Sequence, residues 1–105
     1  MSPEARDDLI AIEKYIAENT GSAEAAKKVV NKIIKNIRRL EAFAGIGAPL
    51  SSIIDMATDY RFLVCDNYIA FYRVESEFVS NKIAVYIDRI LYKKRDYISI
   101  LFGEK

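Results

Sequence analysis

The stretch from Tyr60 to Val74 reads YRFLVCDNYIAFYRV, and it decides the class of fold. Two runs of aromatic and β-branched residues, 60–65 and 68–74, flank Asp66-Asn67, a pair that tolerates positive φ. This pattern predicts two strands joined by a tight antiparallel turn. A second turn is expected after Glu75-Ser76-Glu77, and the apolar run 82–91 then predicts a third strand.

The residues before this hairpin have a helical period instead. Ser2-Pro3 is typical of a helix start, and Gly21 with Ser22 is typical of one helix ending and a second beginning. Apolar residues recur at three- and four-residue spacing in both segments, which predicts an antiparallel helical hairpin. The two stripes are Ala5, Leu9, Ile12 and Ile16, and then Ala26, Val30, Ile33, Ile37 and Leu40.

The remaining segments complete a single α+β domain over residues 1–105. Residues 44–49 contain two glycines and a proline and are expected to form a loop, whereas Asp96 should cap a last short helix carrying Tyr97 and Leu101. Two or three strands are few for a sheet that must cover two helices. Either the sheet is small here, or a strand is missing at the N-terminus.

Composition excludes several functional classes. Of the 105 residues, 51% are hydrophobic and 30% charged, and no apolar run approaches the ~18 residues that a membrane span needs. Histidine is absent, which excludes Ser-His-Asp and Cys-His nucleophile schemes. Cys65 is the single cysteine, so we expect a small core residue in a reducing compartment. No acidic cluster indicates a metal site, and no cofactor is expected.

Charge is balanced overall but unevenly distributed. The net charge is +1, yet residues 27–39 contain six cations and no acid. Such a run is most often the exposed side of an amphipathic helix. A second basic cluster, Lys93-Lys94-Arg95, follows the third predicted strand. Short basic runs of this kind are usually solvated turns.

An ordered series of short motifs resembles the RelE/ParE superfamily, the toxins of type II toxin–antitoxin modules. The resemblance implies helices packed on one side of an antiparallel sheet, a cytoplasmic protein and a role in plasmid stabilisation. In that superfamily a strand precedes the helical hairpin, so the resemblance implies that the N-terminal strand is missing from this sequence. It also implies a cognate antitoxin as partner. The motifs are Ser2-Pro3-Glu4-Ala5, Asp8-Leu9, Tyr15-Ile16, Gly47-Ala48-Pro49-Leu50, Tyr60 to Val64, Tyr68 to Val74 and Arg89 to Tyr97.

The superfamily contains two mechanisms, and the preferred hypothesis is the RelE-like one, cleavage of mRNA on the ribosome. In that family cationic side chains stabilise the extra charge on the phosphate that the ribose 2′-OH attacks. The resemblance implies catalytic roles for Arg61, Arg73, Arg95 and Tyr97, and RNA binding by Lys93 and Lys94. The result would be a metal-independent endoribonuclease, an mRNA interferase.

Two alternatives remain open. A ParE-like toxin would bind DNA gyrase without catalysing a reaction, and Ile69 favours it because RelE-like nucleases place an arginine at that position. A decayed toxin would act only as an antitoxin-binding corepressor.

Structural roles are also open for several of these residues. Most of Tyr60, Tyr68, Tyr72 and Tyr86 are expected to be half-buried cross-strand partners. Arg61 and Arg73 can pair with Glu75, Glu77 or Asp88 across the sheet. An edge left by a missing strand would favour strand pairing with the antitoxin or with a second copy, giving a homo-oligomer.

Overall fold

The computed structural model describes residues 1–76 and 83–103. Helix α1 (Pro3–Thr20) begins at Ser2, whose hydroxyl accepts a hydrogen bond from the Ala5 amide at 3.0 Å. Helix α1 ends at Gly21 in the left-handed conformation, at φ 68°. Helix α2 (Ala23–Ala42) is capped in the same way by Ser22, which accepts from the Ala25 amide at 3.0 Å. These caps confirm the predicted helical hairpin.

The sheet is antiparallel with strand order β1-β2-β3-β4, and its middle part is the predicted hairpin. Strand β2 (Arg61–Cys65) turns into β3 (Tyr68–Ser76) through Asp66, which adopts φ 57°. Strand β4 (Ile83–Tyr92) agrees with the third predicted strand, except that Lys82 and the turn residue Glu77 lie outside the described residues. The α+β class predicted from the sequence is confirmed.

The loop predicted over residues 44–49 contains a strand that the sequence did not reveal. Strand β1 (Ala48–Pro49) pairs with β2, Ala48 opposite Phe62 and Pro49 opposite Arg61. A proline cannot donate a backbone hydrogen bond and is confined to edge strands, and β1 lies at the edge of the sheet. A two-residue strand that ends in proline has no periodicity, so the prediction of a loop was wrong for these residues.

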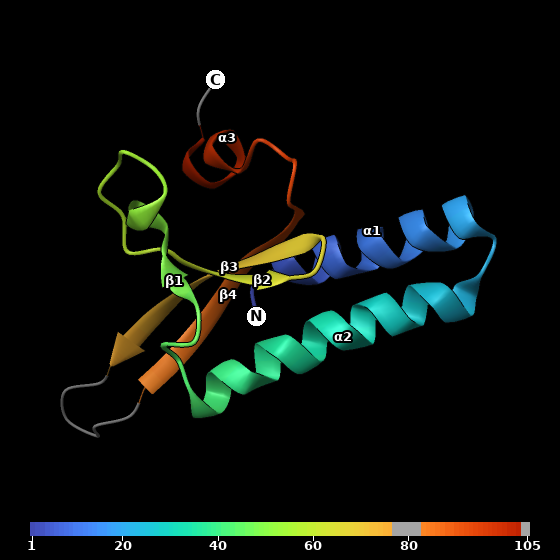
Figure 1. Cartoon of the computed structure of the whole chain (residues 1–105), viewed down its shortest axis with the longest axis horizontal. Coiled ribbons are helices and arrows are strands. Elements are labelled where there is room, and N and C mark those ends of the chain that lie inside the picture. Colours follow the sequence, from blue (N-terminus) through green and yellow to red (C-terminus); the bar gives the residue numbers. More distant parts are fainter. Residues whose placement is uncertain (77–82, 104–105) are drawn as a thin grey trace.

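Both faces of the sheet are covered, and the two layers differ (Figure 1). Helix α1 packs against β4 and α2 against β2, enclosing a core that includes Ile12, Ile33 and Ile90. On the other face, helix α3 (Tyr97–Phe102) and the segment around the short helix η1 (Leu50–Ser52) cover Phe71. The predicted last helix is confirmed, with the Asp96 carboxylate accepting from the Ser99 amide at 3.3 Å.

The outer edge of β4 carries contacts from the start of the chain. The Ser2 amide donates to the Ile87 carbonyl oxygen at 2.8 Å, and the Ser2 hydroxyl donates to the Asp88 carbonyl oxygen at 2.7 Å. Further along α1, the Asp8 carboxylate accepts from the Ile90 amide at 2.9 Å. Part of this edge is therefore occupied by the beginning of α1. Pairing of the edge with the antitoxin or with a second copy stays a prediction.

Burial of the aromatic residues and of Cys65 follows their place in the sheet. Tyr60 and Tyr68 are half-buried as expected, but Tyr72 is fully buried and Tyr86 is 45% exposed. Tyr72 faces the helices in the middle of the core, whereas Tyr86 lies near the start of β4. Cys65 is buried, which confirms its predicted core position. Among the described residues, no helix is both long enough and apolar enough to cross a membrane.

Candidate functional site

Arg61, one of the predicted catalytic residues, holds the connector between α2 and β1. Its Nη2 donates to the Gly47 carbonyl oxygen at 2.7 Å, and its Nε lies 3.4 Å from the Tyr72 hydroxyl. That hydroxyl donates to the Ala44 carbonyl oxygen at 2.9 Å and accepts from the Gly47 amide at 3.2 Å. A Cβ atom at Gly47 would collide with Tyr72 and with the Phe62 carbonyl oxygen, so the close approach requires glycine.

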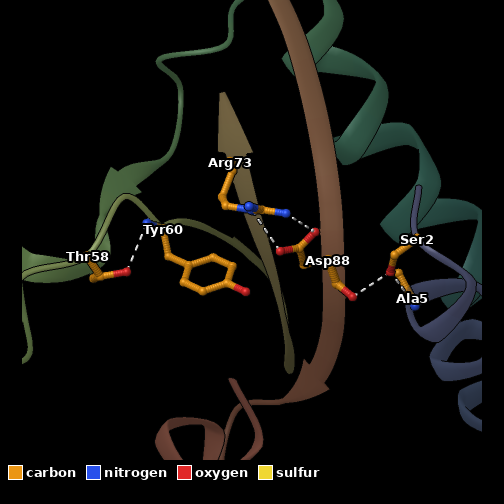
Figure 2. A network of polar contacts seen from close by, with 6 residues as sticks. All are labelled: Ser2, Ala5, Thr58, Tyr60, Arg73 and Asp88. Carbon is orange, nitrogen blue, oxygen red and sulfur yellow. Dashed lines mark hydrogen bonds and ion pairs between the residues drawn. The ribbon is translucent and has the colours of Figure 1, made fainter. Parts of the chain in front are cut away.

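Arg73 lies on the sheet face opposite the helices and is paired with Asp88. Its Nε is 3.0 Å from one carboxylate oxygen of Asp88, and its Nη2 is 3.4 Å from the other. Figure 2 shows the two side chains facing each other across β3 and β4, with Tyr60 beside them. The Arg73 guanidinium carbon lies 5.8 Å from the centre of the Tyr60 ring. One of the acids expected from the sequence is thus the partner of Arg73, whereas Arg61 binds backbone carbonyls.

The electrostatics of this group follow from the ion pair. Hydrogen bonding to Asp88 is the main cause that raises the pKa of Arg73, so its charge is held firmly. Burial is the main cause that raises the pKa of Tyr60, and the neighbouring Asp88 carboxylate adds to it. The phenol of Tyr60 therefore stays protonated at neutral pH and is a poor general base.

Arg61 and Arg73 both line a hollow of about 350 Å³ on this side of the molecule. Tyr60 contributes to its wall, together with the acidic residues Asp59 and Glu75. The structure thus brings two of the four predicted catalytic residues to one place. Both guanidinium groups are already engaged there, one by carbonyl oxygens and one by a carboxylate.

The other predicted site residues lie elsewhere. Lys93 and Lys94 are exposed in the turn between β4 and α3, where a solvated turn was the structural alternative. Arg95 lines a different groove, on the helix side of the sheet. The ring of Tyr97 packs against Phe71, with ring centres 5.2 Å apart, and belongs to the core under α3.

The larger concavity is a groove of about 910 Å³ between the helical hairpin and the β2–β3 turn. Sequence reasoning missed it, because its walls come from segments far apart in the chain. The main causes that raise the pKa of Tyr68 are burial and then the nearby phenols of Tyr15 and Tyr92. The groove combines aliphatic walls (Ile12, Ile16, Val29, Ile33), three tyrosines (Tyr15, Tyr68, Tyr92) and a cationic rim (Lys28, Lys32, Arg95).

A second ion pair, also missed, fixes α1 to the sheet. Arg89 on β4 binds the Asp8 carboxylate with both Nε and Nη2, at 2.8 and 2.9 Å. Hydrogen bonding to Asp8 is the main cause that raises the pKa of Arg89. Bidentate pairs of this kind combine geometric specificity with charge. The two residues are 81 positions apart, so no local pattern could have paired them.

The two helices on one side of an antiparallel sheet agree with the fold that the resemblance implies. A family model described as the ParE toxin of the type II toxin–antitoxin system, parDE, matches residues 1–97. No curated protein matched the sequence. The chain belongs to the ParE toxin family, which confirms the resemblance to the RelE/ParE superfamily. Membership identifies it as a toxin of a type II toxin–antitoxin module and implies a cognate antitoxin as its partner.

Proposed function

We propose that this toxin acts by binding DNA gyrase and catalyses no reaction of its own. The observation that carries the proposal is the separation of the six candidate residues over different surfaces, with Arg61 and Arg73, the two that line one hollow, already engaged. The ParE family match supports it as well. Of the hypotheses drawn from the sequence, we therefore prefer gyrase binding to mRNA cleavage.

The chemistry of RNA cleavage explains why the separation matters. Cleavage without a metal needs a group that takes the proton from the 2′-OH and free cations that meet the charge developing on the phosphate. The guanidinium of Arg73 is neutralised by Asp88, and that of Arg61 stabilises the connector. Tyr97 packs by its ring against Phe71, away from both. A toxin that acts by binding gyrase needs neither a general base nor free cations at Arg61, Arg73 and Tyr97.

For the antitoxin, we propose the groove that Tyr15, Tyr68 and Tyr92 line. Its apolar lining offers area to bury, and Lys28 and Arg95 give its rim a positive charge. An amphipathic helix with an apolar face and acidic flanks fits this combination, as in other helix-in-groove complexes. The acidic flanks would meet the lysine and arginine at the rim.

The test of function removes two groups that an endonuclease would need and a gyrase-binding toxin would not: the Tyr97 hydroxyl and the Arg73 guanidinium. In the Tyr97→Phe variant the ring keeps its packing against Phe71 but the hydroxyl is lost; Arg73→Gln removes the guanidinium. We expect the double variant to arrest growth as strongly as the native toxin when both are induced at equal level. A matched control is Tyr86→Phe, which removes an exposed hydroxyl from the same sheet.

Loss of toxicity in the double variant would contradict the binding proposal. If the double variant folds, as shown by a cooperative unfolding transition and a circular dichroism spectrum like that of the native chain, and growth arrest disappears together with cleavage of ribosome-bound mRNA, the protein is an endonuclease. The binding proposal then fails.

A further inference from the structure

The outer face of α2 has an unusual composition. Between residues 25 and 40 the helix has seven exposed side chains, of which six are cations and the seventh is Asn31. No exposed apolar or acidic residue interrupts them, and the nearest acids in sequence, Glu24 and Glu41, stand at the helix ends. The exposed face of helix α1 has a more usual composition, because it mixes acids, cations and apolar residues such as Ile10 and Tyr15.

The cations form one continuous surface. At 100° per residue they fall within an arc of about 140°, from Lys27 at one side to Lys32 at the other. From Lys27 to Arg39 the surface is about 18 Å long, at 1.5 Å per residue. This length corresponds to about five phosphates of one DNA strand, which rises 3.4 Å per phosphate. We call this surface the cationic face; its members are Lys27, Lys28, Lys32, Lys35, Arg38 and Arg39.

Most of this charge is not neutralised within the molecule. Over residues 1–76 and 83–103, one ion pair involves the face, between Lys32 and Asp66 at 2.6 Å, and both side chains are more than 60% exposed. Exposed pairs of this kind contribute little to stability. The protein as a whole carries a charge of only +1, so the positive charge on α2 is a local concentration and does not reflect the whole surface.

The chemistry of the face favours a polyphosphate over a protein. The buried centre of a protein–protein interface is enriched in aromatic residues and depleted in lysine, and this face has no exposed apolar side chain at all. Contacts to a phosphate backbone need only cations at suitable spacing, because the energy comes from released counterions. An amphipathic protein partner is accommodated better by the neighbouring groove, which has apolar walls.

We propose that the cationic face of α2 binds the phosphate backbone of double-stranded DNA, independently of base sequence. The choice of DNA rests on the proposed function, because gyrase acts on DNA and a toxin bound to it lies next to that DNA. The lysines and arginines would contact phosphate oxygens, which positions the toxin without reading bases. Binding by this face alone is weak and strongly dependent on salt.

The test uses two matched variants. Lys35→Gln/Arg38→Gln removes two cations of the face that neither line the groove nor pair with Asp66. Arg6→Gln/Lys14→Gln removes two exposed cations from α1 and gives the same net charge. Glutamine has nearly the helix propensity of lysine and arginine, so both variants should fold. Binding of the purified proteins to a short labelled DNA duplex, without gyrase, is measured by fluorescence anisotropy over a range of potassium chloride concentrations.

We expect the native chain and the α1 variant to bind with the same salt dependence. The α2 variant should bind about tenfold or more weakly at 0.1 M salt, and the slope of log K against log salt should fall by about two, since each lost phosphate contact removes ~0.9. Equal affinities for the two variants, or no binding of the native chain at low salt, would overturn the proposal. Tighter binding to an RNA duplex of the same sequence would overturn the assignment to DNA.

These outcomes are separate from the proposed function. If the native toxin inhibits gyrase but both variants bind DNA alike, the function stands and the cationic face is only a solvated surface. If gyrase is not inhibited while the α2 variant alone loses DNA binding, the face is confirmed and the gyrase target is wrong.

Discussion

Arg73 on β3 and Asp88 on β4 form an ion pair on the sheet face opposite the helices, with Nε 3.0 Å from one carboxylate oxygen. The side chain of Asp88 is only 17% exposed and that of Arg73 46%. The main-chain oxygen of Asp88 also accepts from Ser2, so one residue connects β3, β4 and the start of α1 (Figure 2). A cation held in this way supports the sheet and is poorly placed to stabilise a reacting phosphate.

The first prediction concerns the energy of this pair. In a double-mutant cycle of Arg73→Ala and Asp88→Ala, we expect a coupling free energy of about 0.5–1 kcal/mol, because the pair is partly exposed and screened by water. Urea unfolding of the four proteins measures it. Additive effects of the two substitutions would show that the pair contributes nothing and that Arg73 is free to do something else.

The second prediction concerns the buried phenol of Tyr72. Tyr72→Phe removes the hydroxyl that binds Ala44, Gly47 and Arg61, and leaves those groups without their partner. We expect the free energy of unfolding to fall by about 1–3 kcal/mol. Tyr86→Phe, at an exposed position on β4, is the matched control and should change stability by less than about 0.5 kcal/mol. Equal effects of the two variants would refute the role given to the Tyr72 hydroxyl.

The third prediction concerns pH. Burial first, and then the Asp66 carboxylate, raise the pKa of the Cys65 thiol from 9.0 to about 11. Between these pH values the unfolded thiol loses its proton while the folded one keeps it, so the unfolded state binds fewer protons and stability falls as pH rises. Cys65→Ala removes this contribution.

The difference between the two proteins is what the pH experiment measures. Urea midpoints taken below pH 9 and again near pH 11 should fall more steeply for the native chain than for Cys65→Ala. All other ionisable groups are the same in both proteins, so their contribution cancels in the comparison. Parallel curves would mean that the thiol is not held in its protonated form.

The fourth prediction tests the groove as the site of the antitoxin. Tyr15 lines the groove and is 62% exposed, whereas Ile10 is equally exposed on α1 but lies outside it. In calorimetric titrations with the cognate antitoxin, Tyr15→Ala should weaken binding at least about fivefold, which corresponds to about 1 kcal/mol for an aromatic contact. Ile10→Ala should leave the affinity unchanged. The reverse order of effects would place the antitoxin on another surface.

The sequence predicted those parts of the fold that depend on neighbouring residues. Ser2, Ser22 and Gly21 determine helix ends through local hydrogen bonds and positive φ, and Asp66-Asn67 determines a turn, so each could be read from the chain. Strand β1 could not, because its pairing with β2 joins segments that no period connects.

The candidate site was less predictable, because its geometry arises from contacts between distant segments. The sequence provided three acids with which Arg73 can pair, and only the register of β3 and β4 selects Asp88 among them. Nothing local showed that Arg61 would bind the carbonyl oxygens of the α2–β1 connector. The resemblance placed Tyr97 near the basic turn, and the direction of α3 then packed its ring against Phe71.

The most direct test of a binding toxin is a gyrase assay without ribosomes. Purified toxin is titrated into DNA gyrase with ATP and relaxed plasmid, and supercoiling is followed on gels, while a parallel reaction monitors mRNA in a cell-free translation extract. Supercoiling should stop at toxin concentrations comparable to that of gyrase, with ribosome-bound mRNA left intact. Full supercoiling at a large excess of toxin, together with cleaved mRNA, would contradict the proposed function.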